Sequence, residues 1–166
     1  MSLKDKIQQD LNAVIKEKKE VEVLVLRQLS AAFLNKEKEK RFKTSKEKQD
    51  ISQADLEKES QLADEEVLAV VVVEAKKRKE AMIEYEKGDR KDLSEKEKKE
   101  LEILQKYLPE QLSEEELKKI LKEAIDKVGA KEMRDMGRVM AEATPKIQGR
   151  ADGSQISKTV KELLGV

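Results

Sequence analysis

The chain has 166 residues, and its 36 Lys and Arg balance its 36 Asp and Glu, so the formal net charge is zero. This balance argues against a protein that coats nucleic acid non-specifically, and the absence of Cys and His excludes disulfides, Cys/His zinc sites and the commonest catalytic triads. Charged residues make up 43% of the chain and aromatic residues 2%, and apolar residues that recur at helical spacing predict an all-α fold.

The first two helices begin the N-terminal part of the chain. Ser2 is placed to cap the first helix, with Asp5 at the capping-box position, and the apolar stripe continues to Ile15. A second helix is predicted over residues 20–41. Its apolar stripe is wide, which predicts packing against two neighbours.

Residues 36–64 are mostly polar, with runs of Lys and Glu and few apolar positions. The pattern allows either an extension of the second helix into solvent or a mobile connection. Charge runs are most often solvated faces, so no function is assigned to this stretch.

A third helix is predicted over residues 64–87. The four valines at 70–73 alone would favour a strand, but the flanking residues have helical spacing and high helix propensity. We expect this helix to be buried all round at its centre and to end at Gly88. Ser94 is then expected to cap a fourth helix that ends before Pro109. The four helices predict an N-terminal helical bundle with long helices over residues 1–108.

A domain boundary is expected at 109–112, so residues 109–166 are predicted to form a three-helix module. Its first helix has a capping box from Ser113 to Glu116 and a stop at Gly129. The second is expected over about 133–143.

Two turns complete the prediction for this module. The second helix is expected to be broken by Thr144–Pro145. A turn at 149–154 then leads into the last helix, with Asp152 or Ser154 as its cap.

Charge is unevenly distributed in this module. Four Glu and no base lie between residues 109 and 116, whereas residues 127–161 hold eight bases and four acids. Lys and Arg beside a helix N-terminus could hold phosphate oxygens, and ordinary solvated surface explains the same pattern. The turn at 149–154 lacks a preceding strand and the Gly-Lys-Ser/Thr spacing, so it is no nucleotide motif. No catalytic, cofactor or metal site is predicted.

The start of the chain has no apolar segment of the kind found in signal peptides. The longest apolar run, Val67–Val73, is far shorter than the ~20 residues that span a membrane. We therefore expect a cytoplasmic protein with no membrane partner.

Several stretches together carry a family resemblance. They are Gly88–Leu93 (GDRKDL), Leu101–Ser113 (LEILQKYLPEQLS), Met136–Met140 (MGRVM) and Gly149–Gly153 (GRADG), with Lys77–Glu80 upstream. As a set they resemble the GatB/YqeY family, and the chain is most similar to the free-standing YqeY-like proteins. The resemblance implies a two-domain helical fold, a four-helix bundle followed by a three-helix module.

The resemblance also implies a function for the C-terminal module. This module is similar to the tail of the B subunit of tRNA-dependent amidotransferases, which convert Glu-tRNA or Asp-tRNA to the amide with glutamine. In those enzymes the tail grips the tRNA body while other domains perform the chemistry. The match here rests on Gly137, Val139 and Met140 with the final turn and helix. The bases nearest to these matches are the candidate RNA-binding residues: Arg138, Lys146, Arg150 and Lys158.

These observations predict a noncatalytic tRNA-binding or tRNA-amidotransferase-related accessory protein. The family's description as a carbon–nitrogen ligase with glutamine as amido-N-donor is expected to reflect the shared tail, because 166 residues leave no room for the larger catalytic portion. The expected partners are tRNA and an amidotransferase or another protein. Two alternatives stay open, a protein–protein adaptor that acts through the N-terminal bundle and a genuine amidotransferase activity.

Overall fold

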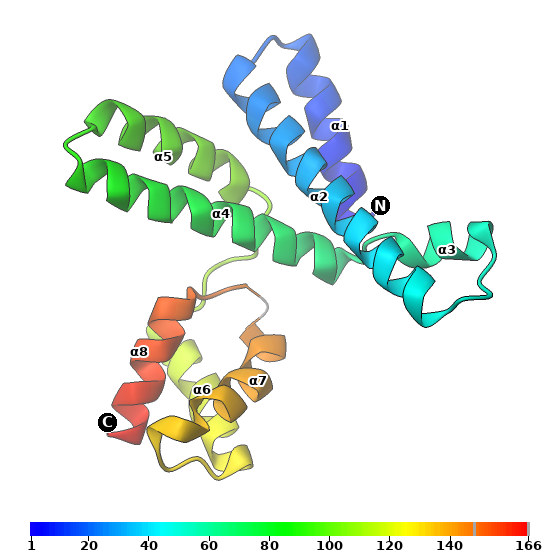
Figure 1. Cartoon of the computed structure of the whole chain (residues 1–166). Helices are drawn as coiled ribbons and strands as arrows, with labels where there is room; N and C mark the ends of the chain where they lie inside the picture. Colours follow the sequence, from blue (N-terminus) through cyan, green and yellow to red (C-terminus); the bar gives the residue numbers. More distant parts are fainter. Residues whose placement is uncertain (148, 166) are drawn as a thin grey trace. The chain divides into compact units, whose positions relative to one another are not determined.

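A computed structural model describes residues 1–147 and 149–165. Within these residues it contains helices and no strand, which confirms the all-α prediction. The chain divides into two compact units, Met1–Tyr107 and Leu108–Val166 (Figure 1). No helix of the described residues has both the length and the apolar character needed to cross a membrane.

The first unit is built from two helical hairpins that pack across each other. The first hairpin joins α1 (Leu3–Lys16) to α2 (Glu20–Glu47), and the second joins α4 (Asp64–Lys87) to α5 (Lys91–Gln105) (Figure 1). The two hairpins meet where α2 contacts both α4 and α5, and where α1 contacts α4. A short helix, α3 (Gln53–Ser60), packs against the end of α2.

The core of this unit follows the predicted apolar stripes. Both parts of the predicted capping box at the start of α1 are present, since Ser2 Oγ accepts from the Asp5 N–H and the Asp5 carboxylate accepts from the Ser2 N–H. Fully buried apolar side chains from all four long helices meet at the crossing. They are Ile7, Val25, Leu26, Leu29, Val67, Val71 and Leu104.

The polar stretch between residues 36 and 64 contains a helix that the sequence did not predict. The second helix does not end near residue 41 but continues to Glu47, and α3 follows after a short turn. Ser52 caps α3 by accepting from the Asp55 N–H at 3.1 Å, and Leu56 is buried. One buried leucine in eight residues gives no apolar periodicity, so the cap was the usable signal.

The turn between α4 and α5 also differs from the prediction. Asp89 adopts a positive φ of 53°, which reverses the chain directly after Gly88, and α5 therefore begins at Lys91. Ser94 is not the N-cap. It lies inside α5, buried, and its Oγ donates to the Glu86 carboxylate at 3.2 Å.

The centre of α4 is buried on one side only, so the expected all-round burial is wrong. Val67 and Val71 are fully buried, whereas Val73 is 51% exposed. The helix forms in spite of four consecutive valines because its other residues, from Asp64 to Lys87, supply both helix propensity and a buried face.

A buried ionic network joins three helices at the hairpin crossing. Arg78 of α4 is only 12% exposed, and its Nη1 donates to Glu74 of the same helix at 2.8 Å. Its Nη2 donates to the Gln28 side chain of α2. Its Nε lies 3.4 Å from the carboxylate of Glu100 in α5, whose side chain is 6% exposed. One guanidinium thus links α2, α4 and α5.

We predict that Arg78→Met destabilises the chain by about 3 kcal/mol, because it leaves the Glu100 carboxylate buried without the Arg78 cation and leaves Glu74 with the exposed Lys77 alone. The matched control is Lys76→Met on the same helix, where an exposed ion pair with Glu80 is lost and a change below about 0.5 kcal/mol is expected. Urea unfolding followed by circular dichroism measures both, and equal midpoints for the two variants would contradict the role assigned to Arg78.

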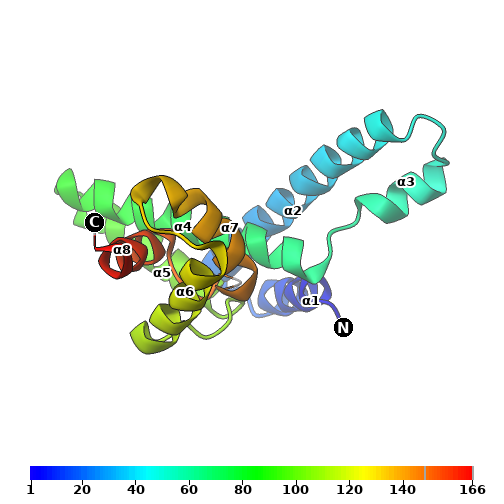
Figure 2. The ribbon, with the colours of Figure 1, turned by 90° about the horizontal axis from the view of Figure 1, so that it is seen from below.

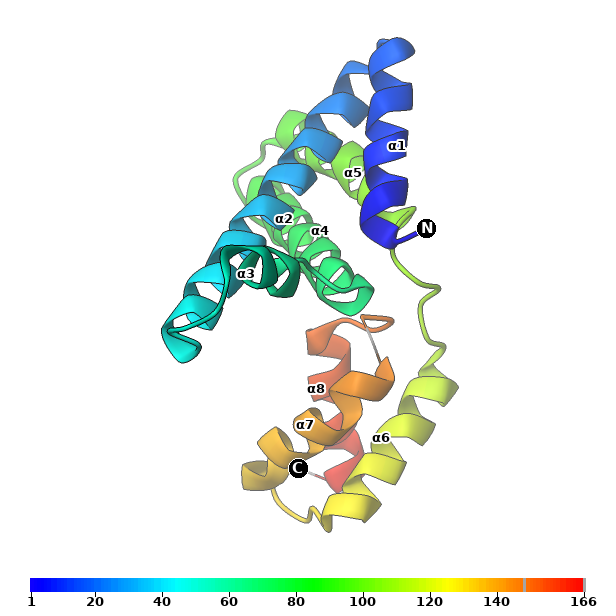
Figure 3. The ribbon, with the colours of Figure 1, turned by 90° about the vertical axis from the view of Figure 1, so that its right-hand side faces the viewer.

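The second unit packs two helices on a third. The helix α6 (Glu114–Val128) contacts both α7 (Met136–Ile147) and α8 (Gly153–Leu164), and a short 3-10 helix, η1 (Met133–Asp135), precedes α7 (Figure 3). Its core is a single apolar cluster. The buried members are Leu117, Leu121, Ala124, Ala130, Val139, Ala143, Ile147, Ile156 and Val160.

The predicted helix ends of this unit are largely confirmed. Ser113 and Glu116 form the capping box of α6, Gly129 ends that helix with φ 65°, and Asp152 caps α8. The expected break at Pro145 is wrong, because α7 continues to Ile147. Proline so near the end of a helix removes one backbone hydrogen bond, and burial of Ile147 in the core compensates for that loss.

Candidate nucleic-acid interface

The four candidate RNA-binding residues lie on α7, on α8 and in the loop between them. Arg138 is in the first turns of α7, and its guanidinium reaches the end of α6. Its Nη2 donates to the Val128 carbonyl at 2.8 Å, and its Nη1 lies 3.6 Å from the Asp135 carboxylate. The side chain remains 64% exposed. Arg138 therefore caps the C-terminus of α6, where a cation is favoured by the helix dipole.

Lys146 lies two turns further along the same face of α7. Its Nζ is 3.5 Å from the Glu123 carboxylate of α6. Between Arg138 and Lys146, Glu142 accepts a hydrogen bond from Lys127 of α6 at 2.6 Å. The border between α6 and α7 is therefore a row of charges of both signs that follows the two helices.

Arg150 holds the segment before α6 against the α7–α8 loop. Its Nε donates to the Glu110 carbonyl at 3.0 Å, and its own carbonyl accepts from the Leu112 N–H at 2.8 Å. Because one residue pairs with the backbone on both sides of residue 111, Arg150 fixes the chain just before the Ser113 cap.

Lys158 differs from the other three candidates. It lies on α8, two residues after the buried Ile156 and two before the buried Val160, and is exposed. Its side chain makes no hydrogen bond or ion pair with any residue that the structure describes. Its ammonium group is therefore open to an external anion.

The structure does not gather the four residues into one cluster. Arg138 binds at the C-terminal end of α6 and Arg150 binds before its N-terminal end, and this helix of 15 residues is about 22 Å long. Lys146 lies between them, and Lys158 is on the third helix. A ligand that touched all four would have to be as large as the unit itself, which fits a folded nucleic acid better than a small molecule.

The acidic residues between these bases stay ionised at neutral pH. Hydrogen bonds from the backbone N–H groups of Lys131 and Glu132 hold the pKa of Asp135 below its usual value, with Arg138 contributing. The hydrogen bond from Lys127 likewise lowers the pKa of Glu142. Arg138 and Lys146 therefore face fixed negative charge, and a phosphate would have to compete with it.

Gly137 is next to Arg138 in the first turn of α7, where it costs helix stability relative to alanine. A Cβ built at this position would meet no atom within 4 Å. Packing inside the unit therefore gives no reason for a glycine here. A surface that approached α7 from outside would give one, because glycine permits close contact with the helix backbone.

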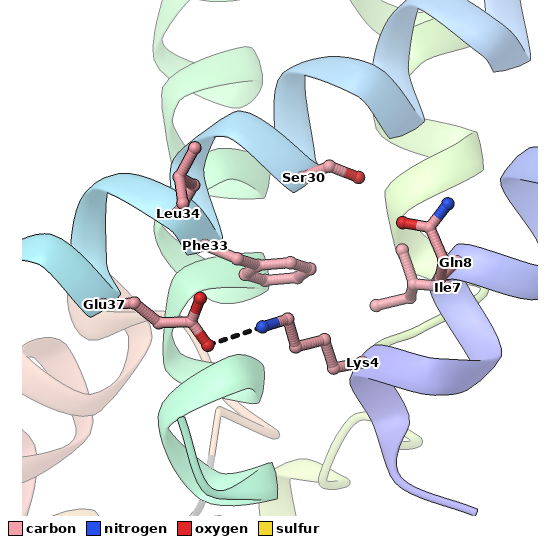
Figure 4. A pocket seen from close by; sticks show the side chains of 7 residues that line it. All are labelled: Lys4, Ile7, Gln8, Ser30, Phe33, Leu34 and Glu37. Carbon is pink, nitrogen blue, oxygen red and sulfur yellow. Dashed lines mark hydrogen bonds and ion pairs between the residues drawn. The ribbon is translucent and has the colours of Figure 1, made fainter. Parts of the chain in front are cut away.

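A pocket of about 200 Å³ lies between α1 and α2, far along the chain from these bases. Phe33 and Ile7 line it, and the Lys4 ammonium points at the Glu37 carboxylate across one end (Figure 4). Those two charges satisfy each other, and the other described residues of the lining are uncharged, so the pocket presents no unpaired charge to a ligand. Within residues 1–147 and 149–165, no three acidic side chains gather in a way that could hold a metal ion.

Sequence reasoning located the candidates but missed what three of them do. The contacts of Arg138, Lys146 and Arg150 span 10, 23 and 40 residues of sequence. No local spacing rule connects positions so far apart. The exposed helix face of Lys158 was, by contrast, visible in the periodicity of α8.

Comparison with known proteins gives a family. A family model described as Yqey-like protein matches residues 45–164, which include α3 to α8. No curated protein matches the chain.

The contacts of Arg150 predict a local effect of its removal. In Arg150→Ala the Glu110 carbonyl loses its donor, and we expect the Leu112 amide hydrogen to exchange roughly fivefold faster, corresponding to about 1 kcal/mol. Lys158→Ala is the matched control and should leave exchange at Leu112 unchanged. Hydrogen exchange followed by NMR measures this, and equal exchange in both variants would show that Arg150 does not hold the segment.

Proposed function

The chain belongs to the YqeY-like family, and on this premise we propose that it is a noncatalytic accessory protein that binds the body of a tRNA through its C-terminal unit. The observation that carries the proposal is the family match, which extends through all three helices of that unit. The unit is the one that resembles the tail of the amidotransferase B subunit.

The geometry of α7 and α8 supports contact with structured RNA. Arg138 and Lys146 line one face of α7 about 12 Å apart, and Lys158 on α8 has no partner among the residues that the structure describes. No Trp, Phe or Tyr occurs after Tyr107, so the unit has no platform for stacked bases. It would therefore recognise the phosphate backbone and the shape of a folded RNA.

The noncatalytic part of the proposal rests on composition. The chain contains no Cys and no His, so the usual nucleophile–base pairs of acyl transfer cannot be assembled. Three of the four candidate bases, Arg138, Lys146 and Arg150, are engaged with carbonyl and carboxylate groups. Binding of RNA requires bases that contact phosphate groups, and it requires no nucleophile or general base.

We predict that Lys146→Gln with Lys158→Gln weakens binding to bulk tRNA and makes its salt dependence shallower, with the slope of log K against log salt falling by about 1 to 2. The matched control is Lys118→Gln with Lys119→Gln, which removes two exposed lysines of α6. Filter binding at several salt concentrations measures both doubles. The proposal fails if bulk tRNA does not bind at about 30 µM protein in low salt, or if both doubles lose the same affinity.

Gly137→Ala separates folding from binding at the proposed surface. Alanine improves helix propensity, so we expect the variant to be more stable by about 0.5 kcal/mol. If RNA approaches the α7 backbone closely, the added methyl group weakens tRNA binding about fivefold or more. Thermal melting and filter binding on the same sample report the two effects, and a stabilised variant with unchanged affinity would show that the glycine does not serve a ligand.

A second candidate function is a protein–protein adaptor that acts through the first unit. The observation in its favour is the outer face of α4, where Val73 and Ile83 are each about half exposed. Valine on a solvated helix face gains nothing from burial and has low helix propensity. Capture of one defined protein that survives nuclease treatment and is lost in Val73→Lys would favour this function over RNA binding.

A further inference from the structure

The distal half of α2 and the helix α3 form an arm that extends from the hairpin crossing (Figure 2). We define the arm as residues 36–60. The first half of the arm, residues 36–48, and the second half, residues 49–60, carry net charges of opposite sign. Residues 36–48 hold seven bases and three acids, and residues 49–60 hold one base and four acids. The bases of the first part are Lys36, Lys38, Lys40, Arg41, Lys43, Lys46 and Lys48.

The inner face of the arm, where α3 lies against α2, neutralises part of this charge. Lys48 pairs with Glu59 of α3 at 2.6 Å, and Arg41 donates to the Gln53 side chain at 2.9 Å. Lys40 pairs with Glu66 at the start of α4, also at 2.6 Å. Of these three bases, Lys48 pairs with an acid of the segment 49–60, Arg41 with a neutral amide and Lys40 with an acid of α4. Lys38, Lys43 and Lys46 form no ion pair with a residue that the structure describes.

The outer face of the arm presents an exposed aromatic ring between two lysines. Phe42 is 60% exposed, and the Lys46 ammonium lies over its ring at 4.4 Å from the centroid. Lys38 lies one turn earlier on the same face and makes no hydrogen bond or ion pair with the described residues. Glu39 is also nearby, but its carboxylate is bound by Lys36 at 2.9 Å, and this bond lowers its pKa.

The pattern around Phe42 selects one kind of partner. A helix that docks on another helix needs apolar anchors at successive turns. The positions one turn from Phe42 on its face are all polar: Lys38, Glu39, Ser45 and Lys46. The next exposed apolar side chain on this face, Leu34, is two turns away. A single ring flanked by cations is instead the arrangement that stacks a nucleic-acid base and holds the phosphates on either side of it.

We propose that the outer face of the arm binds single-stranded RNA, with a base stacked on Phe42 and the neighbouring phosphates held by Lys38 and Lys46. The two lysines are about 12 Å apart along the helix, with the ring midway between them. The surface lies on α2 of the first unit, so its binding does not depend on RNA binding by the C-terminal unit.

The test uses the full chain and a labelled single-stranded RNA of about ten nucleotides and mixed sequence, which matches the site sizes of single-strand binding surfaces. Phe42→Leu keeps an apolar side chain but removes the flat ring, and we expect affinity to fall about tenfold with an unchanged salt slope. Phe42→Tyr retains the ring and should bind within about twofold of the original chain. Since Phe42 is exposed, neither change should alter the melting temperature.

The lysines are tested by a separate pair of variants. Lys38→Gln with Lys46→Gln should make the salt slope shallower by about 1.4, at about 0.7 for each single-strand phosphate released. The matched control, Lys16→Gln with Lys58→Gln, removes two exposed lysines of the same unit that lie outside the outer face. Equal losses in both doubles, or equal binding by the Leu and Tyr variants at position 42, would overturn the proposal.

The outcome is separable from the test of the proposed function. Loss of single-strand binding in the arm variants with unchanged tRNA binding supports the arm site alone. Failure of the single-stranded RNA to bind, while tRNA binding persists and depends on Lys146 and Lys158, overturns the arm site and leaves the proposed function standing. Binding of an acidic peptide with no RNA binding overturns it as well.

Discussion

The guanidinium of Arg78 links three helices of the first unit at the point where its two hairpins cross. A cation taken out of water is tolerated only when its partners are held in place, and these partners come from three helices: Glu74 beside it, Glu100 on α5 and Gln28 on α2. Both carboxylates lie on the same hairpin as Arg78, so their ion pairs hold α4 and α5 together. The hydrogen bond to Gln28 reaches across to the first hairpin. A shift of one hairpin by a helical turn would break this bond, so it adds a directional contact to the apolar packing of the crossing.

The crossing of the two hairpins also sets the position of the arm. α2 is one continuous helix from Glu20 to Glu47, so fixing Gln28 at the crossing also fixes every residue further along. Phe42 lies 14 residues, or about 21 Å, beyond Gln28 on this helix. Ion pairs from Lys40 to Glu66 and from Lys48 to Glu59 then attach the arm along its inner face. These exposed pairs contribute little stability individually, but they determine which side of α2 remains free.

Local signals in the sequence were sufficient to predict where most helices begin and end. Ser2, Ser113, Gly129 and Asp152 act through bonds to residues no more than four positions away, so their roles could be inferred from spacing. Ser94 has the same local pattern but a different role, because the left-handed turn at Asp89 starts α5 four residues earlier. α3 has too few apolar residues to show a period, and the charge pairing with α2 that holds it is a long-range property.

Long-range contacts also limited what the sequence could predict about the candidate interface. Resemblance to a family identified four bases, and sequence could not distinguish those that hold the fold from those open to a ligand. Arg138 and Arg150 donate to backbone carbonyls at the two ends of α6, whereas Lys158 on α8 and Lys38 on the arm have no partner among the described residues. In a chain whose charges cancel in total, a positive potential arises only where a base lacks an acid. Lys16, Lys58, Lys118 and Lys119 are exposed without a partner among the described residues as well. The comparison of Lys38, Lys46 and Lys158 with these four therefore decides whether RNA is bound through the position of a lysine or only through its charge.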